Sequence, residues 1–93
     1  MELSQDVILE CNNCGHQNII DKKSFEVEEY SSERKMGPEI EWDFHGDFNC
    51  EQCGHLMECR IMGYEYPEGA LNSWDKEVSG CVVLYKPSFV IDN

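Results

Sequence analysis

The stretch CNNCGH at residues 11–16 returns as CEQCGH at residues 50–55, so the chain carries the pattern Cys-x-x-Cys-Gly-His twice. Each Cys-x-x-Cys turn bends the backbone so that two sulfur atoms converge on one ion, and zinc favours four thiolates in a tetrahedron. The glycine after each pair suits the turn because glycine tolerates a positive φ. The predicted ligands of one structural zinc ion are Cys11, Cys14, Cys50 and Cys53.

Four protein ligands close such a site and leave no position for water or substrate. The sequence also contains no Ser-His-Asp elbow, no Gly-rich phosphate loop and no His-Glu-x-x-His motif. We therefore expect that the chain is not an enzyme and that the ion serves folding. Metal binding contributes roughly 10 to 16 kcal/mol in small zinc modules, so loss of a ligand or of the metal should unfold the chain.

Other metal-ligating residues lie near or beyond the two pairs. His16 and His55 could each take a ligand position, but four cysteines already complete the tetrahedron. Cys59 and Cys81 lie in apolar stretches, which favours inert buried thiols. A disulfide between these two cysteines, or their use as spare ligands, is the alternative.

The segment between the two pairs predicts a hairpin. Residues 39–48 alternate cleanly, with aromatic and apolar side chains on one face and acidic side chains on the other, and Gly46 within them predicts a bulge. Residues 24–32 favour a strand, with a helix over residues 31–36 as the alternative. The turn signal Met36-Gly37-Pro38 joins the two strands.

Strands are also predicted around this hairpin. The apolar run at residues 7–9 leads into the first cysteine pair, and residues 57–64 alternate after the second. Residues 66–80, with one proline and two glycines, predict a long connection, and residues 81–85 a final strand. The predicted fold class is small, mostly β and antiparallel, with a hairpin inserted between the cysteine pairs and a C-terminal strand extension.

Length and composition predict one domain over residues 1–93. The chain has no run of about 18 to 20 apolar residues, as a membrane span requires. Its first residues lack the basic and apolar regions of a signal peptide, which predicts a cytoplasmic location. In that reducing compartment, cysteines are expected to bind metal or to stay as thiols.

With its two Cys-x-x-Cys-Gly-His knuckles, the chain resembles the zinc-ribbon superfamily, in which strands carry two such knuckles. The resemblance covers the knuckles and their flanking strands, and it implies the fold, the metal and Cys11, Cys14, Cys50 and Cys53 as its ligands, but no activity. Rubredoxins also use two Cys-x-x-Cys-Gly knuckles, so an iron electron carrier is the alternative. Rubredoxin chains are shorter, which favours zinc.

The net charge of the chain indicates which class of partner it can bind. Seven Lys and Arg against nineteen Asp and Glu give a formal net charge of -12 at pH 7. Nucleic-acid binding needs a basic stripe that contacts phosphates, so direct binding is disfavoured and a transcription-accessory role is the alternative. An acidic chain fits a basic protein partner, whose association it accelerates by long-range attraction.

We therefore expect an interaction module such as an inhibitor, an immunity or antitoxin-like protein, or an accessory subunit. The carboxylates are expected to form a solvated acidic surface, with no pair whose setting shifts its pKa. Aromatic residues of the kind that anchor interfaces occur after the second cysteine pair. The candidate partner-binding residues are Glu41, Asp43, Tyr64, Tyr66 and Trp74.

Overall fold

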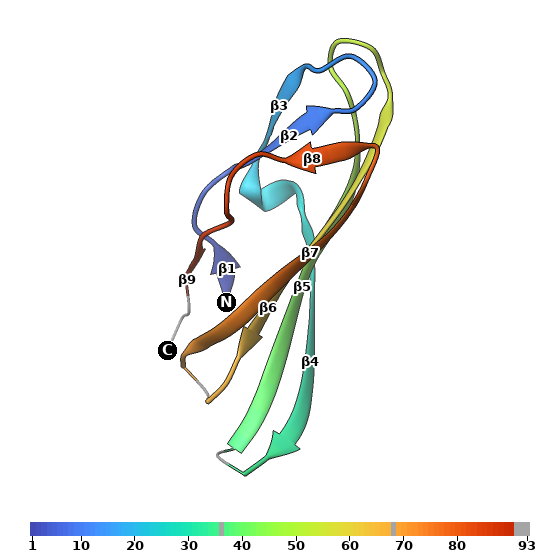
Figure 1. Ribbon diagram of the computed structural model, residues 1–93. Helices are drawn as coiled ribbons and strands as arrows, with labels where there is room; N and C mark the ends of the chain where they lie inside the picture. Colours follow the sequence, from blue (N-terminus) through green and yellow to red (C-terminus); the bar gives the residue numbers. More distant parts are fainter. Residues whose placement is uncertain (36, 68, 91–93) are drawn as a thin grey trace.

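A computed structural model describes residues 1–35, 37–67 and 69–90, whose secondary structure consists of antiparallel strands and one short 3-10 helix (Figure 1). The molecule is elongated, measuring 48 × 19 × 18 Å. The prediction of a small, mostly-β antiparallel fold is confirmed. Within the described ranges, no helix has the length and apolar character that crossing a membrane would require.

A three-stranded sheet carries the first cysteine pair. Its central strand β2 (Val7–Cys11) lies between β3 (Gln17–Ile20) and β8 (Cys81–Val83), and both pairings are antiparallel. The strand predicted from the apolar run at residues 7–9 is confirmed, and alternate residues of β2 are buried from Val7 onward. The final predicted strand is therefore confirmed, although it ends at Val83 rather than at residue 85.

A longer four-stranded sheet forms the rest of the body, and the two loops that carry the cysteine pairs meet at the same end of the molecule (Figure 1). Its strands follow one another in sequence order, all antiparallel. They are β4 (Glu26–Arg34), β5 (Gly37–Asn49), β6 (Leu56–Glu65) and β7 (Leu71–Ser79). The predicted hairpin is β4 and β5; of its predicted turn, Met36 lies outside the described residues.

Two short elements complete the chain. β1 (Glu2–Leu3) pairs with β9 (Phe89–Val90), so the two ends of the described chain run side by side. The 3-10 helix η1 (Lys22–Ser24) links β3 to β4. It begins after Asp21, whose side chain accepts a hydrogen bond from the backbone N–H of Lys23 at 2.8 Å.

The core lies on one face of the long sheet, under β1 and β9. Phe44 is 1% exposed there and its ring lies 6.0 Å from that of Phe89. Gly63 is required for this contact, because a Cβ at that position would lie 2.7 Å from the sulfur of Met1 and 3.2 Å from the Phe89 ring. The ends of the chain therefore pack against the sheet.

The prediction of a long connection over residues 66–80 is wrong, because most of this segment forms β7. Residues Leu71–Ser79 pair with β6 in an antiparallel ladder that has one register irregularity, at Tyr64 and Glu65. β7 is an edge strand on which only Trp74 and Val78 are half-buried. Because most of its side chains are exposed, β7 lacks the apolar alternation by which a half-buried strand is predicted. Main-chain hydrogen bonds to β6 hold it in the sheet.

The predicted bulge at Gly46 is also absent. The β5–β6 register runs without interruption through Gly46 and Cys59. The glycine makes room for an aromatic ring instead, since a Cβ at position 46 would lie 2.7 Å from Cζ of Phe48. That ring packs edge-on against Phe25, with ring centroids 5.2 Å apart.

Candidate metal centre

The four predicted cysteines meet in one cluster. The sulfur atoms of Cys11, Cys14, Cys50 and Cys53 all lie within 4.8 Å of one another. Cys11 Sγ is 3.6 Å from Cys53 Sγ, and Cys14 Sγ is 3.5 Å from Cys50 Sγ. A tetrahedron with metal–sulfur bonds of about 2.3 Å places its sulfurs about 3.8 Å apart. The cluster can therefore hold one metal ion.

The two knuckles have the same backbone geometry. In the first, the N–H of Gly15 donates to the carbonyl of Cys11 at 2.8 Å, and the N–H of Cys11 donates to the carbonyl of His16 at 2.9 Å. The second repeats both hydrogen bonds at the same lengths, from Gly54 to Cys50 and from Cys50 to His55. The repeated sequence thus folds into a repeated turn.

Both turns require their glycine. The φ angles are 77° at Gly15 and 74° at Gly54, in the left-handed region that side chains with a Cβ rarely adopt. The histidines contribute backbone carbonyls to the turns. Within the described residues the ligand cluster contains the four cysteines and neither His16 nor His55.

Two asparagines surround the sulfurs with N–H donors. The backbone N–H of Asn13 donates to Cys11 Sγ and its side-chain amide to Cys53 Sγ, each at 3.4 Å. The amide of Asn18 donates to Cys50 Sγ at 3.6 Å. Donors of this kind spread the negative charge of metal-bound thiolates and orient the ligands.

Sequence reasoning missed Asn18, which is 2% exposed on β3. Its amide also donates to the carbonyl of His16 at 3.2 Å, and its oxygen accepts from the backbone N–H of Glu51 at 3.0 Å. The side chain therefore connects the first knuckle to the second. The available signal was the position of Asn18 directly before the apolar pair Ile19-Ile20, where an asparagine can become buried. A buried polar side chain requires hydrogen-bond partners.

The pKa values of three of the four cluster thiols are shifted. The Asn13 amide is the main group that lowers the pKa of Cys53. Burial opposes ionisation of Cys50, but N–H groups of Cys53, Asn18 and Gln52 lower its pKa to about 6. The N–H of His16 favours the Cys14 thiolate, yet burial and the adjacent sulfurs raise the pKa of Cys14 to about 12. Metal binding there would displace protons.

The remaining cysteines lie outside the cluster. Cys59 and Cys81 are buried free thiols, which agrees with the prediction for both. Burial raises the pKa of Cys59 to about 12, and burial also raises the pKa of Cys81. Neither thiol is therefore a thiolate near neutral pH, as reactivity or metal binding would require.

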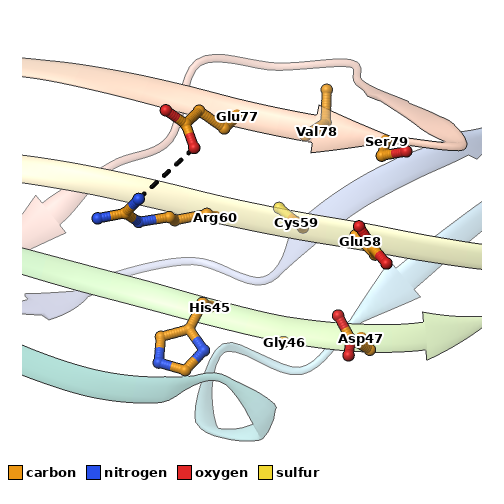
Figure 2. A pocket seen from close by; sticks show the side chains of 9 residues that line it. All are labelled: His45, Gly46, Asp47, Glu58, Cys59, Arg60, Glu77, Val78 and Ser79. Atoms are coloured by element: carbon orange, nitrogen blue, oxygen red, sulfur yellow. Dashed lines mark ion pairs between the residues drawn. The ribbon is translucent and has the colours of Figure 1, made fainter.

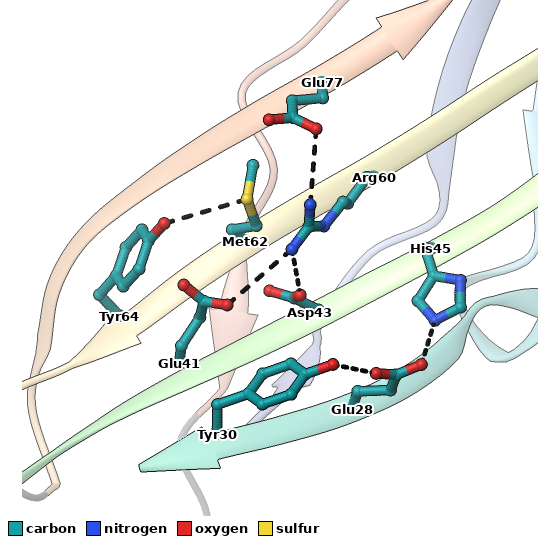
Figure 3. A network of polar contacts seen from close by, with 9 residues as sticks. All are labelled: Glu28, Tyr30, Glu41, Asp43, His45, Arg60, Met62, Tyr64 and Glu77. Atoms are coloured by element: carbon teal, nitrogen blue, oxygen red, sulfur yellow. Dashed lines mark hydrogen bonds and ion pairs between the residues drawn. The ribbon is translucent and has the colours of Figure 1, made fainter. Parts of the chain in front are cut away.

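The candidate partner-binding residues lie in different places. Glu41, Asp43 and Tyr64 share one face of the long sheet (Figure 3). Trp74 is opposite Gly63, on the other face, and the guanidinium carbon of Arg34 lies 5.3 Å from the ring centroid of Tyr66. The structure brings three of the five together.

The sequence predicts solvated carboxylates. Two of the candidates, Asp43 and Glu41, depart from that prediction. Asp43 is 3% exposed and its Oδ2 lies 2.5 Å from a guanidinium nitrogen of Arg60. Burial and the adjacent Asp43 carboxylate raise the pKa of Glu41, against the opposing effects of Tyr64 and Arg60. The expectation that no acidic pair has a shifted pKa is therefore wrong for Glu41.

Neither the fold nor the knuckles identify a family. No protein family, no curated protein and no solved structure matches the chain.

Proposed function

We propose that the chain is a zinc-stabilised interaction module that binds a basic protein partner through one face of its long sheet. Zinc is favoured over harder cations because all four ligand atoms are sulfur. Four protein ligands leave no open coordination position, so the ion's role is to hold the two knuckles together. The proposed binding surface lies on the sheet below them.

The observation that carries the proposal is the distribution of charge on that face. Alternate residues of β4 to β7 place their side chains on the face of the long sheet that carries Glu41 and Asp43. We call this face the acidic face. Its basic residues are Arg34 and Arg60. Its carboxylates are Glu26, Glu28, Glu39, Glu41, Asp43, Asp47, Glu58, Asp75 and Glu77. Asp43 apart, these acidic side chains are exposed or half-buried.

Like charges lie directly opposite one another on this face. Glu28 is the cross-strand partner of Asp43, and Asp47 that of Glu58. Such pairs are destabilising in an antiparallel sheet. Asp47 and Glu58 also line a shallow pocket of about 360 Å³, with Arg60 and Glu77 further along the same face (Figure 2). A cationic partner would neutralise this excess of charge.

Native mass spectrometry of protein isolated from its own source tests both halves of the proposal. We expect one zinc ion per chain and a bound basic protein that dissociates at high salt. Visible thiolate-to-iron absorption in the isolated protein would show that the bound ion is iron and not zinc. Tight, salt-dependent binding to nucleic acid would favour the transcription-accessory alternative.

Charge reversal locates the surface. The double variant Glu58→Lys/Glu77→Lys should lose the partner, because both side chains lie on the acidic face. The matched control Glu29→Lys/Glu33→Lys makes the same change in net charge on exposed positions of the opposite face and should retain it. Equal losses in the two variants would contradict the assignment of the acidic face.

A further inference from the structure

Tyrosine rings flank a carboxylate in one cross-strand row of the acidic face. Tyr30 on β4 is the register partner of Glu41 on β5, which is in turn the partner of Tyr64 on β6. The Glu41 side chain is 30% exposed and Tyr30 is 51% exposed. A ligand approaching from solvent would therefore meet a carboxylate between two phenol rings (Figure 3).

Asp43 adds an unpaired acceptor beside this row. Its Oδ2 pairs with Arg60, but its Oδ1 is buried and, in the described part of the chain, receives no hydrogen bond. Figure 3 shows this second oxygen on the side of the carboxylate that faces Glu41. Two ionised carboxylates cannot donate to each other, so the pair lacks a donor. A buried acceptor without a donor is uncommon and calls for a partner.

Arg60 does not neutralise the pair. One guanidinium nitrogen lies 2.5 Å from Asp43 Oδ2 and 4.0 Å from Glu41 Oε2, while the other terminal nitrogen lies 3.5 Å from Glu77 Oε2. A single positive charge is thus shared among three carboxylates. Glu28, the cross-strand partner of Asp43, accepts from the hydroxyl of Tyr30 and lies 3.1 Å from Nε2 of His45.

We infer that Glu41 and Asp43, with the rings of Tyr30 and Tyr64, form a binding site for an arginine side chain of the basic partner. The inference rests on the proposed function and names its recognition chemistry. A guanidinium is planar, carries five donors and stacks on aromatic faces. It can donate to the half-buried Glu41 carboxylate while lying against the exposed Tyr30 ring, and the adjacent negative charge of Asp43 adds to the attraction. A lysine ammonium offers no planar surface and is more strongly hydrated.

The test compares two blocked peptides, Gly-Arg-Gly-Arg-Gly and Gly-Lys-Gly-Lys-Gly, titrated into the zinc-loaded full chain at low salt and followed by NMR. We expect the arginine peptide to bind about fivefold more tightly and to shift the ring resonances of Tyr30 and Tyr64. Glu41→Gln should weaken its binding about fivefold and remove the preference for arginine. Glu29→Gln removes the same charge from the other face and should change binding by less than about twofold.

A second variant pair tests the ring without altering a carboxylate. Tyr30 lies on the exposed edge strand β4, so substitutions there are expected to leave the fold intact. Tyr30→Phe should keep the preference for arginine, and Tyr30→Leu should reduce it about threefold. An equal loss of the preference for arginine in Tyr30→Phe and Tyr30→Leu would show that the ring takes no part in binding, and it would overturn the inference.

The outcomes separate this inference from the proposed function. If both peptides bind equally and Glu41→Gln weakens binding no more than Glu29→Gln, the arginine site is wrong while attraction of basic ligands stands. If neither peptide binds at low salt, both the arginine site and the acidic interaction surface are overturned.

Discussion

Asn18 accepts a hydrogen bond of 3.0 Å from the backbone N–H of Glu51, which lies thirty-three positions further along the chain. Its amide also donates to Cys50 Sγ at 3.6 Å and to the carbonyl of His16 at 3.2 Å. One buried side chain therefore connects the knuckles in addition to the cysteine cluster. Asn18 thereby links the position of the Cys50 sulfur to strand β3, which carries the asparagine.

Asn18→Ala should lower both stability and metal affinity. The substitution leaves the Glu51 N–H and the His16 carbonyl without this partner, at a cost of about 2 kcal/mol. Loss of the donor to Cys50 should weaken zinc binding roughly tenfold to a hundredfold. Competition with a chromogenic chelator measures the affinity. Asn12→Ala, at an exposed position of the first knuckle, is the control and should change neither quantity appreciably. Equal effects of the two variants would remove Asn18 from the site.

Gly80→Ala should destabilise the chain more than Gly15→Ala. The two glycines have nearly equal φ angles, 76° and 77°, so an alanine suffers similar backbone strain of about 1–2 kcal/mol at either position. A Cβ at position 80 would also lie 2.4 Å from the carbonyl oxygen of Leu56, whereas a Cβ at position 15 meets no atom within 4 Å. Denaturant unfolding of the zinc-loaded variants gives the difference, which we expect to exceed about 1 kcal/mol. Equal losses would show that the Leu56 contact relaxes freely.

Cys59 and Cys81 should resist alkylation in the folded protein. Burial raises the pKa of Cys59 to about 12, so its thiolate is scarce at pH 8, and both side chains are shielded from reagent. Iodoacetamide labelling followed by peptide mass spectrometry should modify neither residue until denaturant unfolds the chain. Labelling of Cys59 at native conditions, at the rate of a free thiol, would contradict this packing.

The knuckles were predictable because their chemistry is local. Two thiols, a turn and a glycine lie within a few residues, and the repeat pairs one set with the other. β7 was not predictable in this way, since an edge strand with only Trp74 and Val78 half-buried has no apolar alternation. Its pairing with β6 depends on main-chain hydrogen bonds that the side-chain pattern does not encode.

Asp43 shows a second limit of the sequence pattern. Its place in the alternation of residues 39–48 correctly assigns it to the polar face, and a polar face is ordinarily solvated. Asp43 is buried instead, and it is paired with Arg60, which reaches it from the neighbouring strand at 2.5 Å. Which side chain lies beside Asp43 is fixed by the β5–β6 register, and that register becomes known only from the structure.

Glu41→Gln should stabilise the chain at pH 7, because burial and Asp43 raise the pKa of Glu41. A carboxyl with a raised folded-state pKa stabilises below its unfolded pKa, and this contribution is lost as pH rises through the folded pKa. Removing the charge should therefore increase the unfolding free energy at pH 7 by roughly 0.5 kcal/mol, the scale of a like-charge contact on a sheet. Denaturant unfolding measures the gain, with Glu29→Gln as control, and ¹³C NMR follows the titration of Glu41. A less stable Glu41→Gln variant would show that Arg60 and Tyr64 already compensate the charge.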